Sequence, residues 1–125
     1  MPSNRWVTFQ SPEPGREYLA LLSLLPLKRF SALPKFFGYL RQIQAQLKHT
    51  PGLVGYSLYA RPFQLRFWTL SVWESDAALT EFVNQRPHDD VMAALQDKMG
   101  ETRFVQWKMM GLQYPPSWHD AFKHR

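Results

Sequence analysis

The stretch "TLSVWESDAALTEFVNQRPH", residues 69–88, decides the fold. It opens as a strand in which hydroxyl-bearing and aromatic side chains alternate with wholly aliphatic ones, so the two groups face opposite sides of a sheet. Ser75 then stands where a helix needs an N-cap, and Pro87 interrupts that helix just before His88. The stretch therefore predicts a strand that leads directly into a helix.

Outward from this stretch, periodicity and turn residues predict the remaining elements. A helix begins near Pro34, carries apolar residues at helical spacing and stops at Thr50-Pro51-Gly52. Two β-branched and aromatic runs separated by Pro62-Phe63-Gln64 predict a hairpin. The expected order is a strand at 18–25, a helix from 33 to about 49, strands at 53–61 and 65–74, a helix from 76, a further helix at 88–99 and a strand at 102–110.

This order is typical of the split βαβ arrangement, an α+β, ferredoxin-like fold with helices on one side of an antiparallel sheet. We expect a single domain over residues 1–125, with its core at about 18–110 and an aromatic tail at 111–125 that docks on it. Helices on one side leave the other sheet face bare. A second copy covering that face, in a homodimer, is the simplest solution.

The strand of the opening stretch also predicts a ligand cavity. Its apolar face suits packing under helices, whereas its mixed face suits a cavity that orients a small molecule. Packing in a dimer core is the competing interpretation of the same aromatic rings. The candidate ligand-binding residues are Phe67, Thr69, Ser71 and Trp73, with Ser57 and Tyr59 of the preceding strand extending the same wall.

Composition narrows the functional classes. The chain has no Cys, which excludes disulfides and thiolate chemistry, and its net charge of +5 comes mostly from isolated basic residues. The strand "RFWTLSVW" lacks the glycine of an RNA-recognition motif, so we expect no nucleic-acid partner. An absent signal-peptide pattern and an apolar run broken by Pro26 favour a cytoplasmic protein without a membrane partner.

The segment "FWTLSVWESDAALTEFV", residues 67–83, resembles the dimeric α/β-barrel superfamily that contains antibiotic-biosynthesis-type monooxygenases. A strand ending in Trp-Glu-Ser before a helix is typical of that group. The closer likeness is to an uncharacterised subgroup similar to spheroidene monooxygenase. It rests on Thr69-x-Ser71-x-Trp73, Phe82, Pro87-His88, Met92 and the segment "HTPGLVGYSLYARP" at 49–62.

The resemblance implies oxygen chemistry of several kinds. Members include cofactor-independent oxygenases, haem-degrading enzymes and proteins without known activity. Phe82 and Met92 stand where the haem-degrading branch has Trp and its axial His, which argues against haem breakdown. Spheroidene monooxygenase is reported to use haem, so the cofactor is expected to be either none or haem, with His88 as base or as axial ligand. A helix-start histidine bonded to backbone or water is the alternative for His88.

The sequence thus favours a monooxygenase-like protein that acts on a small apolar or aromatic substrate. The alternative is a non-catalytic protein of the same fold that binds a small ligand or haem. No metal site is expected, because His119 and His124 of the tail do not share a helical face and no tight ligand set accompanies them.

Overall fold

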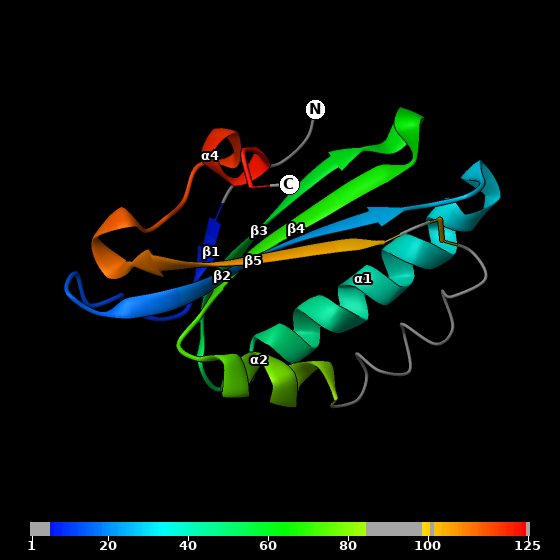
Figure 1. Ribbon diagram of the computed structural model, residues 1–125. Helices are drawn as coiled ribbons and strands as arrows, with labels where there is room; N and C mark the ends of the chain where they lie inside the picture. Colours follow the sequence, from blue (N-terminus) through cyan, green and yellow to red (C-terminus); the bar gives the residue numbers. More distant parts are fainter. Residues whose placement is uncertain (1–5, 85–98, 101, 125) are drawn as a thin grey trace.

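Five antiparallel strands form one sheet in the computed structural model, which describes residues 6–84, 99–100 and 102–124 (Figure 1). Their order across the sheet is β1-β3-β4-β2-β5. The strands are β1 (Trp6–Thr8), β2 (Glu17–Pro26), β3 (Leu53–Arg61), β4 (Arg66–Trp73) and β5 (Arg103–Met110). Without β1, this is the ferredoxin-like order, and the expected α+β fold is confirmed.

Two helices cover one face of the sheet, which we call the inner face (Figure 1). Helix α1 (Leu33–Leu47) has a proline in its first turn and buries Phe36 against the sheet. Helix α2 (Asp76–Val83) begins at the predicted cap, where the backbone N–H of Ala78 donates to Ser75 Oγ at 3.2 Å. A proline in the first turn therefore marks the start of α1, and a capping side chain marks the start of α2.

The loop of the β3–β4 hairpin sets which side chains share a face. It contains the 3₁₀ turn η2 (Pro62–Gln64) followed by Leu65, which has a φ of 57°, so the strands resume with Arg61 opposite Arg66. A loop of three residues would instead pair Arg61 with Leu65. Because a shift of one residue turns every side chain of a strand to the other face, this extra loop residue changes the composition of both faces.

The strongly apolar face of β4 does not lie under α1 and α2, contrary to the sequence-based expectation. Trp68, Leu70 and Val72 point to the opposite, outer face, where they join separate core clusters. These apolar side chains are covered by the C-terminal segment and not by the two long helices. The mixed side of β4 lies beneath the helices.

The C-terminal segment docks on the outer face through η3 (Gly111–Gln113) and α4 (Trp118–Phe122) (Figure 1). The indole Nε1–H of Trp118 donates to Ser57 Oγ at 3.0 Å, and both side chains are buried. His124 stacks on Trp107 of β5 at 3.9 Å between ring centroids. The premise that this face is bare was therefore wrong, because the chain covers much of it itself.

Strand β1 was not anticipated, and it extends the sheet beside β3. Strands β1 and β3 and the C-terminal segment meet closely at Gly55. A Cβ at this residue would collide with the hydroxyl of Tyr114 and approach the carbonyl of Val7. The predicted helix at 88–99 falls almost entirely outside the described residues. No described helix is both long and apolar enough to cross a membrane.

Candidate functional site

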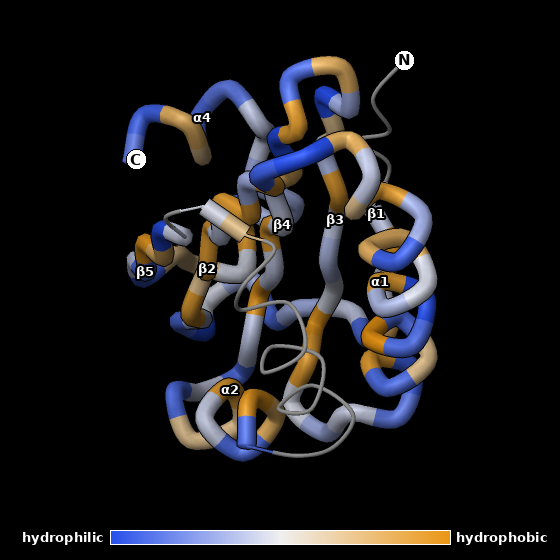
Figure 2. The backbone as a smooth tube through the Cα atoms, turned by 90° about the vertical axis from the view of Figure 1, so that its right-hand side faces the viewer, coloured by the Kyte–Doolittle hydropathy of each residue, from blue (hydrophilic) through white to orange (hydrophobic). Residues whose placement is uncertain are grey.

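A cavity of about 500 Å³ lies between the inner face of the sheet and helices α1 and α2. This volume is within the range of sites that hold a small molecule. Figure 2 shows apolar backbone positions of both helices turned toward the strands. The described lining is mainly apolar: Leu21, Leu25, Leu40, Ile43, Leu47, Tyr56, Leu58, Trp73, Leu79, Phe82, Val83 and Phe104, with Ser23, Gln44, Thr69, Ser71, Asp76, Thr80 and Gln106 as its polar members.

Strand β4 supplies the wall that the sequence pointed to. Thr69, Ser71 and Trp73 all line the cavity. Trp73 is 1% exposed, and its indole Nε1–H donates to Ser71 Oγ at 2.8 Å. Phe67 lies on the same face but belongs to the adjacent core, with its ring 4.5 Å from that of Phe36. Whether these residues bind a ligand stays a prediction.

Ser57 and Tyr59 do not extend this wall, and their predicted placement was wrong. The hairpin register pairs Ser57 with Leu70 and Tyr59 with Trp68, both on the outer face. Ser57 accepts the hydrogen bond of Trp118, and Tyr59 packs its ring edge-on against Trp68 at 5.6 Å. Both side chains therefore hold the C-terminal segment rather than line the cavity.

Tyr56 is a polar cavity residue that the sequence reasoning missed. It lies directly opposite Ser71 and lines the cavity. Burial raises the pKa of its phenol above the ordinary value of 10.0, while a side-chain hydrogen bond with Gln44 opposes that rise. Tyr56 therefore stays protonated near neutral pH and can donate a hydrogen bond to an oxygen of a ligand. The correct register of the hairpin would have identified it.

The raised pKa of Tyr56 predicts a loss of stability in alkali. The unfolded chain releases this proton at lower pH than the folded one, so the folded form is favoured fully below pH 10 and loses this advantage as pH rises further. We expect the free energy of unfolding of Tyr56→Phe to fall less steeply above pH 10 than that of the wild type. Urea unfolding between pH 8 and 11 measures it, and parallel pH profiles would contradict the assignment.

Candidate acid–base groups at the cavity are few among the described residues. Among the described residues that line the cavity, Asp76 is the one with an acidic side chain, and it is exposed at the start of α2. The described histidines, His49, His119 and His124, do not line the cavity. His88, the predicted base, lies outside the described residues. Within the described part of the chain, no three His, Asp or Glu side chains converge as a metal site requires.

Haem fits the described lining poorly. An axial ligand is usually His, Cys, Met or Tyr, and the described residues around the cavity offer only Tyr56. The raised pKa of that phenol disfavours the phenolate that would bind iron. The described residues therefore supply no axial ligand for haem.

Comparison with known proteins finds no matching family model and no matching curated sequence. Solved structures do match. A proposed antibiotic biosynthesis monooxygenase from Nitrosomonas europaea has a TM-score of 0.65 at 15% identity, over 89% of this chain and 100% of the other. SnoaB, a cofactor-independent oxygenase from Streptomyces nogalater, has a TM-score of 0.58 at 16% identity, over 80% of this chain and 98% of the other.

A longer protein matches in the same way. A proposed monooxygenase from Lactobacillus acidophilus has a TM-score of 0.64 at 9% identity, covering 88% of this chain. The match spans only 51% of that protein, so the present chain corresponds to about half of it. At these identities the likeness concerns the backbone. The chain therefore has the ferredoxin-like α+β fold of the antibiotic-biosynthesis-monooxygenase-like proteins.

Proposed function

We propose that the chain is a monooxygenase-like protein that takes a small apolar or aromatic molecule into the cavity beneath α1 and α2. The composition of that cavity carries the proposal. Apolar side chains from the sheet and both helices surround it, and a few polar groups converge from adjacent strands. Tyr56 offers a donor, while Thr69 and Ser71 offer hydroxyls on the neighbouring strand. Such a lining suits a flat molecule with one or two oxygen atoms.

In a cofactor-free reaction the substrate itself supplies the electrons. A base removes a proton from the methylene carbon of a ketone, or of the keto form of a phenol such as a dihydroxynaphthalene, and the resulting carbanion reacts with O₂. The carbon gains one oxygen as a carbonyl, while the second oxygen leaves as water with the two hydrogens of the methylene. The Tyr56 hydroxyl would stabilise the negative oxygen of the deprotonated substrate, because a protonated donor in an apolar site favours such a charge. His88 remains the proposed base.

Two further properties belong to the proposal. We propose a cytoplasmic protein, as argued from its sequence, and a homodimer. Because the C-terminal segment covers much of the outer face, we propose the β5 edge of the described sheet as the pairing surface. Phe104, 55% exposed, and Met110 lie on that strand. Sedimentation velocity would show a dimer that Phe104→Lys dissociates, and a monomeric wild type would refute it.

Binding of 1-naphthol, measured by titration calorimetry, tests the cavity. Tyr56→Phe removes one hydroxyl and should weaken binding about fivefold, the usual worth of one neutral hydrogen bond. Tyr59→Phe makes the same change on the same strand but on the outer face, so its affinity should equal that of the wild type. Equal affinities for all three proteins would show that the molecule does not use this cavity.

Oxygen consumption separates the monooxygenase from the non-catalytic alternative. Dihydroxynaphthalenes are added to the protein, and the rate is compared with that of the same solution without protein. Protein-dependent uptake that falls in Tyr56→Phe and persists in Tyr59→Phe supports turnover in the cavity. Binding without uptake selects a ligand-binding protein of the same fold.

A further inference from the structure

A second hollow, of about 880 Å³, lies on the outer face of the sheet and opens away from the cavity described above. Strands β4, β2 and β5 form its floor. Its lining includes the apolar side chains of Leu22, Leu24, Trp68 and Val105 and the basic side chains of Arg66 and Arg103. The sheet lies between this hollow and the inner cavity, and Phe104 of the edge strand β5 is the one described residue that lines both.

The register places the two arginines on the same face as the apolar floor. Leu24 is opposite Trp68 of β4 on one side and opposite Arg103 of β5 on the other. Arg66 pairs with Pro26, two residues further along β2. Directly opposed residues of antiparallel strands point to the same side of a sheet. Both guanidinium groups therefore stand beside one apolar surface.

The charge at this end of the sheet is not neutralised within the described residues. Arg66 lies directly opposite Arg61 of β3, and like charges in that position repel each other. Elsewhere basic side chains have acidic partners, as in the pairs Lys108–Glu17 at 3.7 Å and Arg16–Glu74 at 3.9 Å. Among described residues, no carboxylate pairs with Arg61, Arg66 or Arg103.

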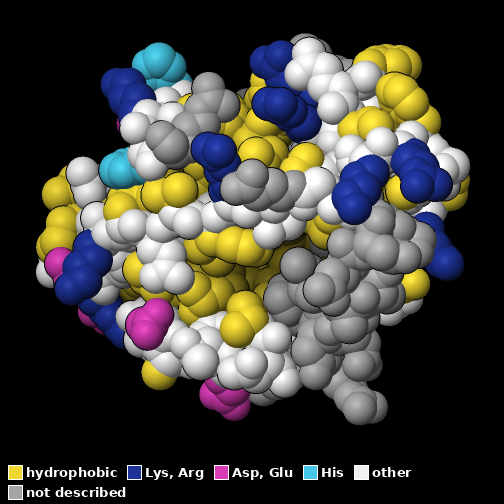
Figure 3. All heavy atoms as spheres, turned by 45° about the vertical axis from the view of Figure 1, so that its right-hand side comes forward, with side chains coloured by type: hydrophobic (Ala, Val, Ile, Leu, Met, Phe, Trp, Pro, Cys, Tyr) yellow, Lys and Arg dark blue, Asp and Glu magenta, His cyan; other side chains and the backbone are white. Residues whose placement is uncertain are grey.

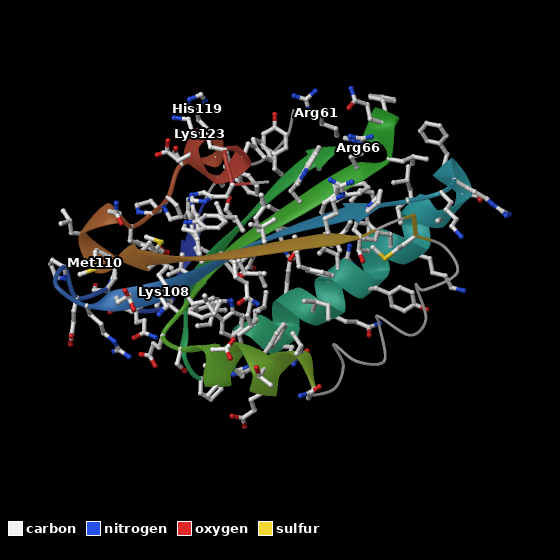
Figure 4. The ribbon with its side chains drawn as sticks, viewed as in Figure 1. Arg61, Arg66, Lys108, Met110, His119 and Lys123 are labelled. Atoms are coloured by element: carbon white, nitrogen blue, oxygen red, sulfur yellow. The ribbon has the colours of Figure 1, made fainter. Side chains whose placement is uncertain are left out.

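Figures 3 and 4 agree with this arrangement. Figure 4 shows Arg61 and Arg66 on the side of the sheet that carries α4, directed away from α1. Arg61 donates a hydrogen bond to the Tyr59 hydroxyl at 3.4 Å and lies over that ring, so it is held at the border. In the upper half of Figure 3, Lys and Arg side chains are spaced around exposed hydrophobic atoms. An apolar surface bordered by arginines without an acidic partner among the described residues favours a ligand that has both an apolar part and a negative charge.

We propose that this outer hollow binds a small amphipathic anion, an apolar body that carries a carboxylate or phosphate group. The apolar body lies over Leu24, Trp68 and Val105, where it removes apolar surface from water. The anionic group meets Arg66 and Arg103, whose planar guanidinium groups match a carboxylate or a phosphate with two parallel hydrogen bonds. The anion also relieves the repulsion between Arg66 and Arg61.

Titration calorimetry at low salt with four probes tests the two halves of this requirement. Octanoate and octyl phosphate carry both features, 1-octanol has only the apolar body, and acetate has only the charge. The first two should bind and the last two should not, at matched concentrations. Whichever of octanoate and octyl phosphate binds more tightly shows whether the site prefers a carboxylate or a phosphate.

Variants then assign the binding to the hollow. Arg66→Gln and Arg103→Gln should each weaken the binding of octanoate and octyl phosphate about tenfold or more, the worth of one charge-assisted hydrogen bond. Arg41→Gln, an exposed arginine of α1, is the matched control and should leave affinity unchanged. All of these positions are exposed, so the variants are expected to fold normally.

Three results would overturn the proposal. The first is no binding of octanoate or octyl phosphate by the wild type. The second is binding of 1-octanol as tight as that of octanoate. The third is unchanged affinity in both arginine variants together with a loss in Tyr56→Phe, which would place the anion in the inner cavity instead.

Discussion

Trp73→Ala is expected to lower the free energy of unfolding by about 4 kcal/mol, as large-to-small changes at buried aromatic positions do. Trp73 is 1% exposed and ends β4 at the point where the chain enters α2. Its ring lies 5.3 Å from that of Phe82 and therefore joins the sheet to the helix. Removing it also leaves Ser71 without its 2.8 Å hydrogen bond. Urea unfolding followed by circular dichroism measures the loss.

The control at the same position is Trp73→Phe. It keeps an aromatic ring against Phe82 but removes the indole N–H, so it should cost about 1 to 2 kcal/mol. A second control is Val7→Ala on β1, where the side chain is 41% exposed and little should change. A loss below about 1 kcal/mol for Trp73→Ala would mean that this wall of the cavity is not part of the core.

The elements could be predicted because their signals are local. Ser75 caps α2 through its own side chain, and a proline starts α1, so a short window of sequence contains the cause of each boundary. The apolar stripe of α1 likewise reports its buried side without reference to any other element. Each of these features can be recognised in the sequence without knowledge of the tertiary structure. The order of elements, and with it the fold class, follows from them.

The membership of the cavity wall could not be predicted in the same way. It depends on whether the hairpin loop ends at Gln64 or at Leu65, a difference of one residue. A left-handed backbone conformation is usually found at Gly or Asn, so a leucine at position 65 does not indicate one. Thr69, Ser71 and Trp73 were placed correctly relative to one another because they lie on one strand. Ser57 and Tyr59 were predicted to line the cavity in place of Tyr56, because the faces of β3 were inferred from those of β4 with a loop that was one residue too short.

The position of the C-terminal segment also had no local signal. Its anchoring bond joins Trp118 to Ser57, 61 residues away in the chain. The sequence showed only that the segment is aromatic enough to dock. Which surface receives it depends on tertiary packing, which also decides whether the outer face is available to a second copy.

Trp118→Ala should release the C-terminal segment from the sheet and lower the free energy of unfolding by about 3 to 4 kcal/mol. Trp118 is buried against Leu22, Trp68 and Leu70, and its N–H satisfies Ser57 at 3.0 Å. The change leaves that buried hydroxyl without this partner and exposes apolar sheet surface to water. Urea unfolding measures the loss, and faster exchange of the backbone amides of α4 reports the release.

Trp118→Phe separates the two contributions of this side chain. It retains ring contacts with Tyr59 and Phe122 but cannot donate to Ser57, so about 1 to 2 kcal/mol should be lost while α4 stays docked. Sedimentation velocity of Trp118→Ala measures self-association, because exposed apolar sheet surface favours association. Concentration-dependent association of Trp118→Ala, absent in Trp118→Phe, would show that the C-terminal segment occupies a surface able to receive a second copy. Unchanged stability of Trp118→Ala would instead mean that the segment contributes nothing to the fold.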